Sequence, residues 1–69
     1  MTKEEFCDLL MSKGYRVVMG SEDGQGYMPV VLIKNREEMN EVIQVVKEIA
    51  LVYDYHFSWG VSVESNNDN

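Results

Sequence analysis

The stretch from Tyr53 to Glu64 constrains the fold more than any other part of the sequence. Its odd positions are aromatic or aliphatic, and its even positions are polar or glycine. Successive side chains of an extended strand point to opposite faces, so this alternation places the apolar groups on one side. The stretch also holds four of the seven aromatic residues of the chain. We therefore predict one long β-strand over residues 53–64, with the core built against its odd face.

The length of 69 residues leaves room for one domain. Residues 1–64 combine apolar and polar positions in regular patterns, whereas residues 65–69 are all polar. We predict a single α+β domain over residues 1–64 and a disordered tail over residues 65–69.

Capping signals mark the start of two predicted helices. Thr2 and Glu5 have the spacing of a capping box, an apolar stripe follows, and Gly14 is a natural left-handed terminator, which predicts a helix over residues 3–13. Asn35 and Glu38 have the same spacing ahead of a second apolar stripe. This pattern predicts a second helix of about four turns, ending near residue 50.

Two shorter strands are predicted between the helices. Residues 15–20 alternate in polarity, and residues 28–33 are apolar on both faces, which is typical of a central strand. Residues 20–26 contain three glycines and two acids, which predicts a flexible hairpin loop. Pro29 has no amide to donate, so we expect it near the start of its strand or on an unpaired side.

The predicted fold is a two-layer α+β sandwich of order α-β-β-α-β, in which both helices cover one face of a three-stranded sheet. The last strand is parallel to the second, but it could lie beside either the first or the second. The doubly apolar second strand favours a central position for itself. In topology alone, the order resembles a ferredoxin-like βαββαβ domain without its first strand.

Charge and composition restrict the possible partners. Twelve acidic and six basic residues give a net charge of −6, which disfavours direct binding to nucleic acid and favours a protein partner with a basic surface. The longest uncharged run is too short to span a bilayer, so we expect no membrane contact. The single cysteine fits a reducing compartment, and the first residues lack a signal-peptide pattern, which together predict a cytoplasmic protein.

The residue pattern does not predict an enzyme. Asp54, His56 and Ser58 are the residue types of a catalytic triad, but alternate residues of a strand are about 6.6–7 Å apart and a triad needs contacts of about 2.6–3.2 Å. One histidine, one cysteine and scattered carboxylates do not have metal-ligand spacing. We therefore predict no catalytic residues, no cofactor and no metal.

The hypothesis with most support is a non-enzymatic, acidic protein-binding module. The helix dipole and the caps account for the carboxylates in the first helical turns. The predicted protein-binding residues lie elsewhere, on the hairpin loop, the second helix and the polar face of the last strand: Glu22, Asp23, Glu41, Glu48, Asp54, His56, Ser58 and Glu64. In size and charge the chain resembles phage-encoded inhibitors of host defence proteins. That resemblance implies an inhibitor or modulator that mimics nucleic acid and occupies a basic surface of its partner.

The alternative is a small regulatory or ligand-sensing homodimer with the truncated ferredoxin-like topology. The sheet face opposite the helices would carry apolar residues of the second strand, and apolar patches on small proteins often mark contacts. The long last strand would also overhang its shorter neighbours and leave an unpaired edge. Either surface could pair two copies.

Overall fold

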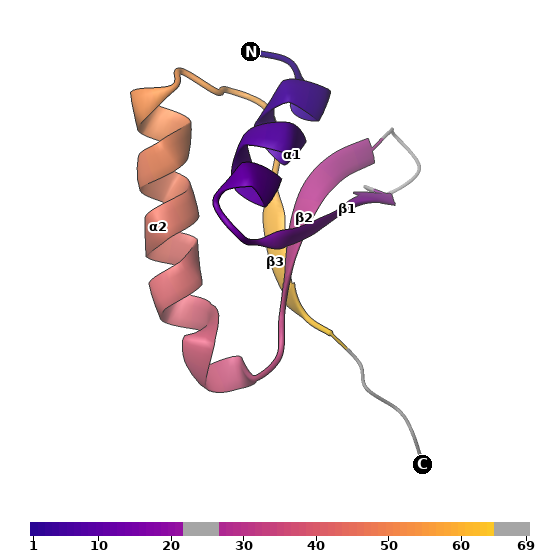
Figure 1. Cartoon of the computed structure of the whole chain (residues 1–69), viewed down its shortest axis with the longest axis vertical. Helices are drawn as coiled ribbons and strands as arrows, with labels where there is room; N and C mark the ends of the chain where they lie inside the picture. Colours follow the sequence, from indigo (N-terminus) through magenta and orange to yellow (C-terminus); the bar gives the residue numbers. More distant parts are fainter. Residues whose placement is uncertain (22–26, 65–69) are drawn as a thin grey trace.

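The computed structural model describes residues 1–21 and 27–64 (Figure 1). Along the chain lie α1 (Lys3–Ser12), β1 (Arg16–Ser21), β2 (Tyr27–Ile33), a 3-10 turn η1 (Arg36–Glu38), α2 (Met39–Val52) and β3 (Gly60–Val63). The strands form one sheet of order β1-β2-β3, with β1 antiparallel and β3 parallel to β2. The predicted α+β fold and element order are confirmed.

The sheet order that the sequence left open has β2 in the centre. Because β2 and β3 are direct neighbours, the sheet departs from the split βαβ arrangement of ferredoxin-like domains. The predicted hairpin loop and the predicted tail contain residues 22–26 and 65–69, which lie outside the described residues.

Both ends of α1 follow the sequence signals. The hydroxyl of Thr2 accepts a hydrogen bond from the amide of Glu5 at 3.1 Å, and the Glu5 carboxylate accepts one from the Thr2 amide at 2.8 Å. At the other end Gly14 has φ 98°, and the amide of Tyr15 donates to the carbonyl of Leu10 at 3.2 Å. The helix therefore ends in a Schellman motif, for which glycine is the favoured residue.

The second predicted capping box is wrong. The side chain of Asn35 makes no capping hydrogen bond, and the amide of Glu38 instead donates to the backbone carbonyl of Asn35 at 3.2 Å. The chain tightens here into η1 before α2 begins at Met39. A backbone carbonyl thus satisfies the amide that the side chain was expected to cap.

The predicted long strand over residues 53–64 is also wrong, because only Gly60–Val63 form β3. Asp54 has φ 59°, in the left-handed region, and its amide donates to the carbonyl of Leu51 at 3.3 Å. The amide of Tyr55 donates to the carbonyl of Ala50 at 2.8 Å. These two bonds form a second Schellman motif, with aspartate in the position that glycine usually occupies.

The odd positions of this stretch therefore do not share one face. Tyr55 is buried and its ring stacks on that of Phe6, with centroids 3.9 Å apart. Phe57 is 55% exposed and meets the Tyr55 ring edge-on, with centroids 5.7 Å apart. Figure 1 shows the connection between α2 and β3 passing the start of α1. The stack of Phe6 on Tyr55 joins these two segments.

The core lies between the helices and β2. Phe6 and Leu10 of α1 and Val46 of α2 are fully buried, together with Val31 of β2. One hydrophobic cluster contains these residues and further ones from the same elements and the α2–β3 connection, namely Ile33, Val42, Ala50 and Tyr55. The arrangement of both helices on one face of the sheet stays a prediction.

The conformation of Asp54 leads to a test that separates the turn from the predicted strand. Asp54→Val should lower the free energy of unfolding by about 1–2 kcal/mol, because a β-branched residue is strained in the left-handed region. In an extended strand the same change would be neutral or stabilising. Urea unfolding measures the difference, and Asp54→Asn is the matched control because asparagine tolerates this conformation without the charge. Equal stability of the valine and asparagine variants would contradict the turn.

Candidate functional site

The predicted protein-binding residues fall into separate places. Glu22 and Asp23 lie outside the described residues. Glu41 and Glu48 are exposed on α2 and lie seven residues apart, which places them on nearly the same face of the helix. These two carboxylates are one part of the predicted site that lies together, because they share a helix face.

The side chains of Asp54 and His56 lie in contact with one another and are exposed. Nε2 of His56 lies 3.0 Å from Oδ1 of Asp54, with side chains 77% and 86% exposed respectively. The two residues lie in and after the left-handed turn at Asp54 and not in the extended strand that was predicted. Ser58 follows in the same connection and is exposed, and its backbone carbonyl accepts a hydrogen bond from the Tyr55 hydroxyl at 2.8 Å. The three polar residues therefore belong to the α2–β3 connection.

Glu64 lies at the opposite end of the sheet and has a basic partner. Its Oε2 is 2.6 Å from Nη1 of Arg16, which comes from the other edge strand. The pair spans the face of β2 at Leu32, the residue that pairs with Arg16 in the strand register. The predicted protein-binding residues within the described ranges thus occupy α2, the α2–β3 connection and the sheet end, and they do not form one patch.

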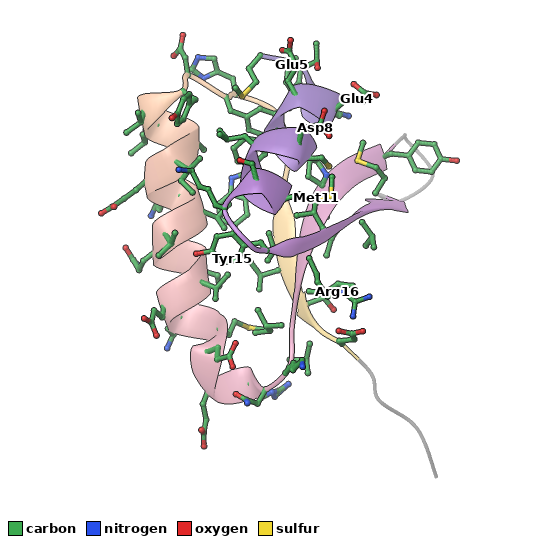
Figure 2. The ribbon with its side chains drawn as sticks, viewed as in Figure 1. Glu4, Glu5, Asp8, Met11, Tyr15 and Arg16 are labelled. Carbon is green, nitrogen blue, oxygen red and sulfur yellow. The ribbon has the colours of Figure 1, made fainter. Side chains whose placement is uncertain are left out.

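Two further carboxylates lie together on α1. Glu4 and Asp8 are exposed and one helical turn apart, a spacing that places them on one face. Figure 2 shows them with Met11 on the side of α1 toward β1 and β2 in that view. We call Glu4 and Asp8 the α1 acidic pair. The sequence interpretation attributed Glu4 to the helix dipole and did not weigh Asp8, although their i, i+4 spacing was visible.

A hollow of about 450 Å³ adjoins Glu4 of the α1 acidic pair. It is lined by Lys3 and Glu4 of α1, Met19 of β1 and Tyr27 of β2. Nζ of Lys3 donates to the carbonyl of Tyr27 at 2.6 Å, which ties α1 to the start of β2. The hollow therefore lies between the first turns of α1 and the end of the β1–β2 pair that is nearer the hairpin loop.

Cys7 connects the same region to β1. Its Sγ lies 3.4 Å from Sδ of Met19 in a hydrogen bond of the thiol. Burial raises the pKa of the Cys7 thiol above its ordinary value of 9.0, and the negative charges of Asp8 and Glu4 raise it further. Cys7 is consequently a neutral thiol at pH 7, and both carboxylates lie close enough to act on it electrostatically.

The other face of the sheet carries an apolar strip. The register places Val18 of β1 beside Val30 of β2, and Val18 is 45% exposed while Val30 is half-buried. A Cβ on Gly20 would lie 2.9 Å from Cγ2 of Val30. The absence of a side chain at Gly20 therefore leaves room for the Val30 side chain over β1. Met28 and Leu32 extend the strip along β2 and are also half-buried. We call this surface the open sheet face.

Two further findings concern a metal site and a membrane-spanning helix. Among residues 1–21 and 27–64, no three acidic, histidine or cysteine side chains gather where they could hold a metal ion. Neither helix in the same ranges combines the length and the hydrophobicity that crossing a membrane requires.

Comparisons with known proteins give no relative for the chain, since no family model matches it and neither a curated protein nor a solved structure is detectably similar.

Proposed function

We propose that this chain is a non-enzymatic, cytoplasmic protein-binding module whose acidic surface engages a basic surface of its partner and blocks or modulates it. The observation that carries the proposal is the α1 acidic pair, Glu4 and Asp8, exposed beside an open hollow and an outer strand of the sheet. A partner that binds here would contact the two carboxylates, the side chains that line the hollow and the backbone of the edge strand.

The charges of this surface are available to a partner. Within the described ranges, the charged contacts shorter than 4 Å are Arg16–Glu64 and the contact of His56 with Asp54. The α1 acidic pair and the pair on α2, Glu41 and Glu48, therefore make no salt bridge there, although Lys3 lines the hollow beside Glu4. The net charge of −6 adds a long-range attraction toward basic surfaces. Such attraction raises association rates and selects partners, and it weakens as salt rises.

Paired charge reversals test the proposal and locate the surface. The partner is captured with this chain as bait from a lysate of the cells that naturally make it, and is then purified. The Kd of the complex between the two proteins is measured at several salt concentrations. Glu4→Lys/Asp8→Lys should weaken binding by about tenfold or more and reduce its salt dependence, since attraction at two close sites becomes repulsion. Glu41→Lys/Glu48→Lys applies the same change to the face of α2 that the sequence predicted.

Glu37→Lys/Glu38→Lys is the matched control, because it changes the net charge equally in η1. An equal effect of all three reversals would assign the attraction to net charge alone. Unchanged affinity and salt dependence in both the α1 and the α2 variants would contradict an acidic binding surface.

The second candidate is the homodimer, which the open sheet face favours because Val18 is 45% exposed there. Strands of six, seven and four residues give this face a footprint of about 270 Å². Stable interfaces bury about 800 Å² on each partner, so this face alone is small for a lasting dimer. Light scattering on the purified chain at micromolar concentration accompanies the binding measurement, and a dimer there would favour this second candidate.

A further inference from the structure

β1 forms one edge of the sheet, and its outer side has no neighbouring strand among residues 1–21 and 27–64. Edge strands present unpaired amides and carbonyls, and proteins commonly protect them with lysine, proline or a bulge. β1 contains neither lysine nor proline, and its register with β2 runs without a bulge over all six residues. Val18 and Met19 at its centre are 45% and 38% exposed. The edge is therefore open to another strand.

The hydrogen bonds of β2 determine which groups of β1 face outward. The carbonyl of Ile33 accepts from the amide of Glu64 at 2.7 Å, so the backbone of Ile33 faces β3. Alternate residues of a strand bond to the same side, so Val31 faces β3 as well, and Pro29 has the same orientation. These two residues pair with Val17 and Met19 of β1.

Val17 and Met19 therefore occupy the non-hydrogen-bonded positions of the β1–β2 pair. Their amides and carbonyls point away from β2, to the outer side of β1. Val18, by contrast, pairs with Val30 in a hydrogen-bonded position, so its amide is used within the sheet. Two residues of β1 thus offer two donors and two acceptors to an incoming strand.

The surroundings of this edge differ on its two sides. The side chain of Met19 lies on the side of α1, where it contacts Cys7 and lines the hollow together with Glu4 and Lys3. The ammonium of Lys3 is held by the carbonyl of Tyr27. The carboxylate of Asp8 lies one turn further along the same helix (Figure 2). Val18 lies on the open sheet face beside Val30, and the Arg16–Glu64 ion pair bounds this apolar surface at Leu32. One side of the edge is acidic and the other is apolar.

We propose that the outer edge of β1 binds an extended segment of the partner as a fourth, antiparallel strand, with lysine or arginine at alternate positions and apolar residues between them. Residues opposite Val17 and Met19 would point toward the α1 acidic pair, and the residues between them would lie beside Val18. This inference rests on the proposed function and names the chemistry of its partner.

The charges favour such a segment over a second copy of this chain. In a pair of β1 strands, the positions facing α1 would be Val17 and Met19 of each copy, which carry no positive charge. Two α1 acidic pairs would also approach one another, and like charges at short range oppose association. A basic segment supplies the complementary charge at the same positions.

A synthetic peptide of alternating lysine and valine is the probe. Its binding is followed by fluorescence anisotropy and by amide NMR of the full chain at low salt. We expect the largest shifts at the amides of Val17 and Met19, and at least about tenfold weaker binding when glutamate replaces lysine in the peptide. Glu4→Lys/Asp8→Lys should weaken binding of the lysine peptide by a similar factor.

Backbone methylation isolates the strand pairing from the charge. In an antiparallel pair with lysines opposite Val17 and Met19, the lysine amides donate to β1 and the valine amides face solvent. N-methylation of the lysines should therefore abolish binding, whereas N-methylation of the valines should leave it within about twofold. The two methylated peptides have the same charge and composition, so they are matched.

Two single proline substitutions in β1 test the same strand pairing from the side of the protein. Met19→Pro removes an outward amide and should keep the fold while it prevents binding, because proline is tolerated where an edge amide faces solvent. Val18→Pro removes an amide used within the sheet and should lower the melting temperature much more. If Met19→Pro fails to fold, the methylated peptides still decide the question.

Equal binding of the two methylated peptides would overturn the added strand. If binding then still weakened in Glu4→Lys/Asp8→Lys, the acidic module would stand without it, so the two proposals fail separately. Shifts of the Val17 and Met19 amides with protein concentration, in the absence of peptide, would instead identify a second copy on this edge and overturn the proposal.

Discussion

Phe6→Ala should lower the free energy of unfolding by about 3–5 kcal/mol, the usual range for truncating a buried aromatic residue. Phe6 is fully buried, and its ring stacks on Tyr55 at a centroid distance of 3.9 Å with an interplanar angle of 4°. A chain of 69 residues has a total stability of only about 3–10 kcal/mol, so this one loss removes a large share of it. The variant should be partly unfolded at 25 °C.

Urea unfolding followed by circular dichroism measures this effect. Phe57→Ala is the control, because Phe57 meets the same tyrosine edge-on but is 55% exposed. Its truncation should cost about 1 kcal/mol or less. A loss below about 1 kcal/mol for Phe6→Ala would show that the stack with Tyr55 does not hold α1 to the α2–β3 connection.

The chain should lose stability steeply between pH 10 and pH 12 because of Tyr55. Burial raises the pKa of this phenol from 10.0 to about 12, with smaller contributions from the negative charges of Cys7 and Glu4. The folded state therefore keeps the proton in a range where the unfolded state has released it. The contribution is fully present below pH 10 and is lost as pH rises toward 12, and it amounts to at most about 3 kcal/mol.

Tyr55→Phe isolates this contribution. The variant loses the hydrogen bond from the hydroxyl to the Ser58 carbonyl, which should cost about 0.5–1.5 kcal/mol near neutral pH. It should also show a shallower decline of the urea midpoint above pH 10, while the raised pKa of Cys7 acts equally in both proteins. Parallel stability curves for the two proteins from pH 9 to pH 12 would rule out the shifted phenol.

Much of the fold was predictable because its signals are local. The capping box of Thr2 and the left-handed terminator Gly14 act within a few residues of the helix that they bound. The apolar character of β2 on both faces favoured the central place that it has, although the sequence left the sheet order open. Each of these features depends on residues close together in the sequence.

The errors arose where contacts distant in sequence decide the conformation. The alternation from Tyr53 onward satisfied the pattern of a strand, but the contact of Tyr55 with Phe6 and the left-handed turn at Asp54 override it. Aspartate gives a weaker turn signal than glycine, so the period-2 pattern prevailed in the prediction.

The candidate site was less predictable than the fold, because surface patches are assembled by packing. Glu64 appeared available from the sequence, whereas Arg16 from the far edge strand pairs with it. Glu4 appeared to be accounted for by the helix dipole, whereas its position beside Met19 follows from how α1 packs on β1. Sequence spacing identifies residues on one element, and only the packing shows which elements they border.

The stack of Phe6 on Tyr55 also bears on how the chain folds during its synthesis. The two rings join the first helix to a connection 49 residues later, and β3, the second neighbour of β2, follows still further along. A nascent chain that has emerged only as far as α2 lacks the α2–β3 connection with Tyr55, and it also lacks β3. Such a chain already holds the cluster residues of α1, β2 and α2, but Phe6 has no ring to stack on and β2 has only β1 beside it. The remaining long-range contacts must form before their loop entropy is repaid. We therefore expect folding to wait until β3 has left the ribosome and then to occur in one cooperative step.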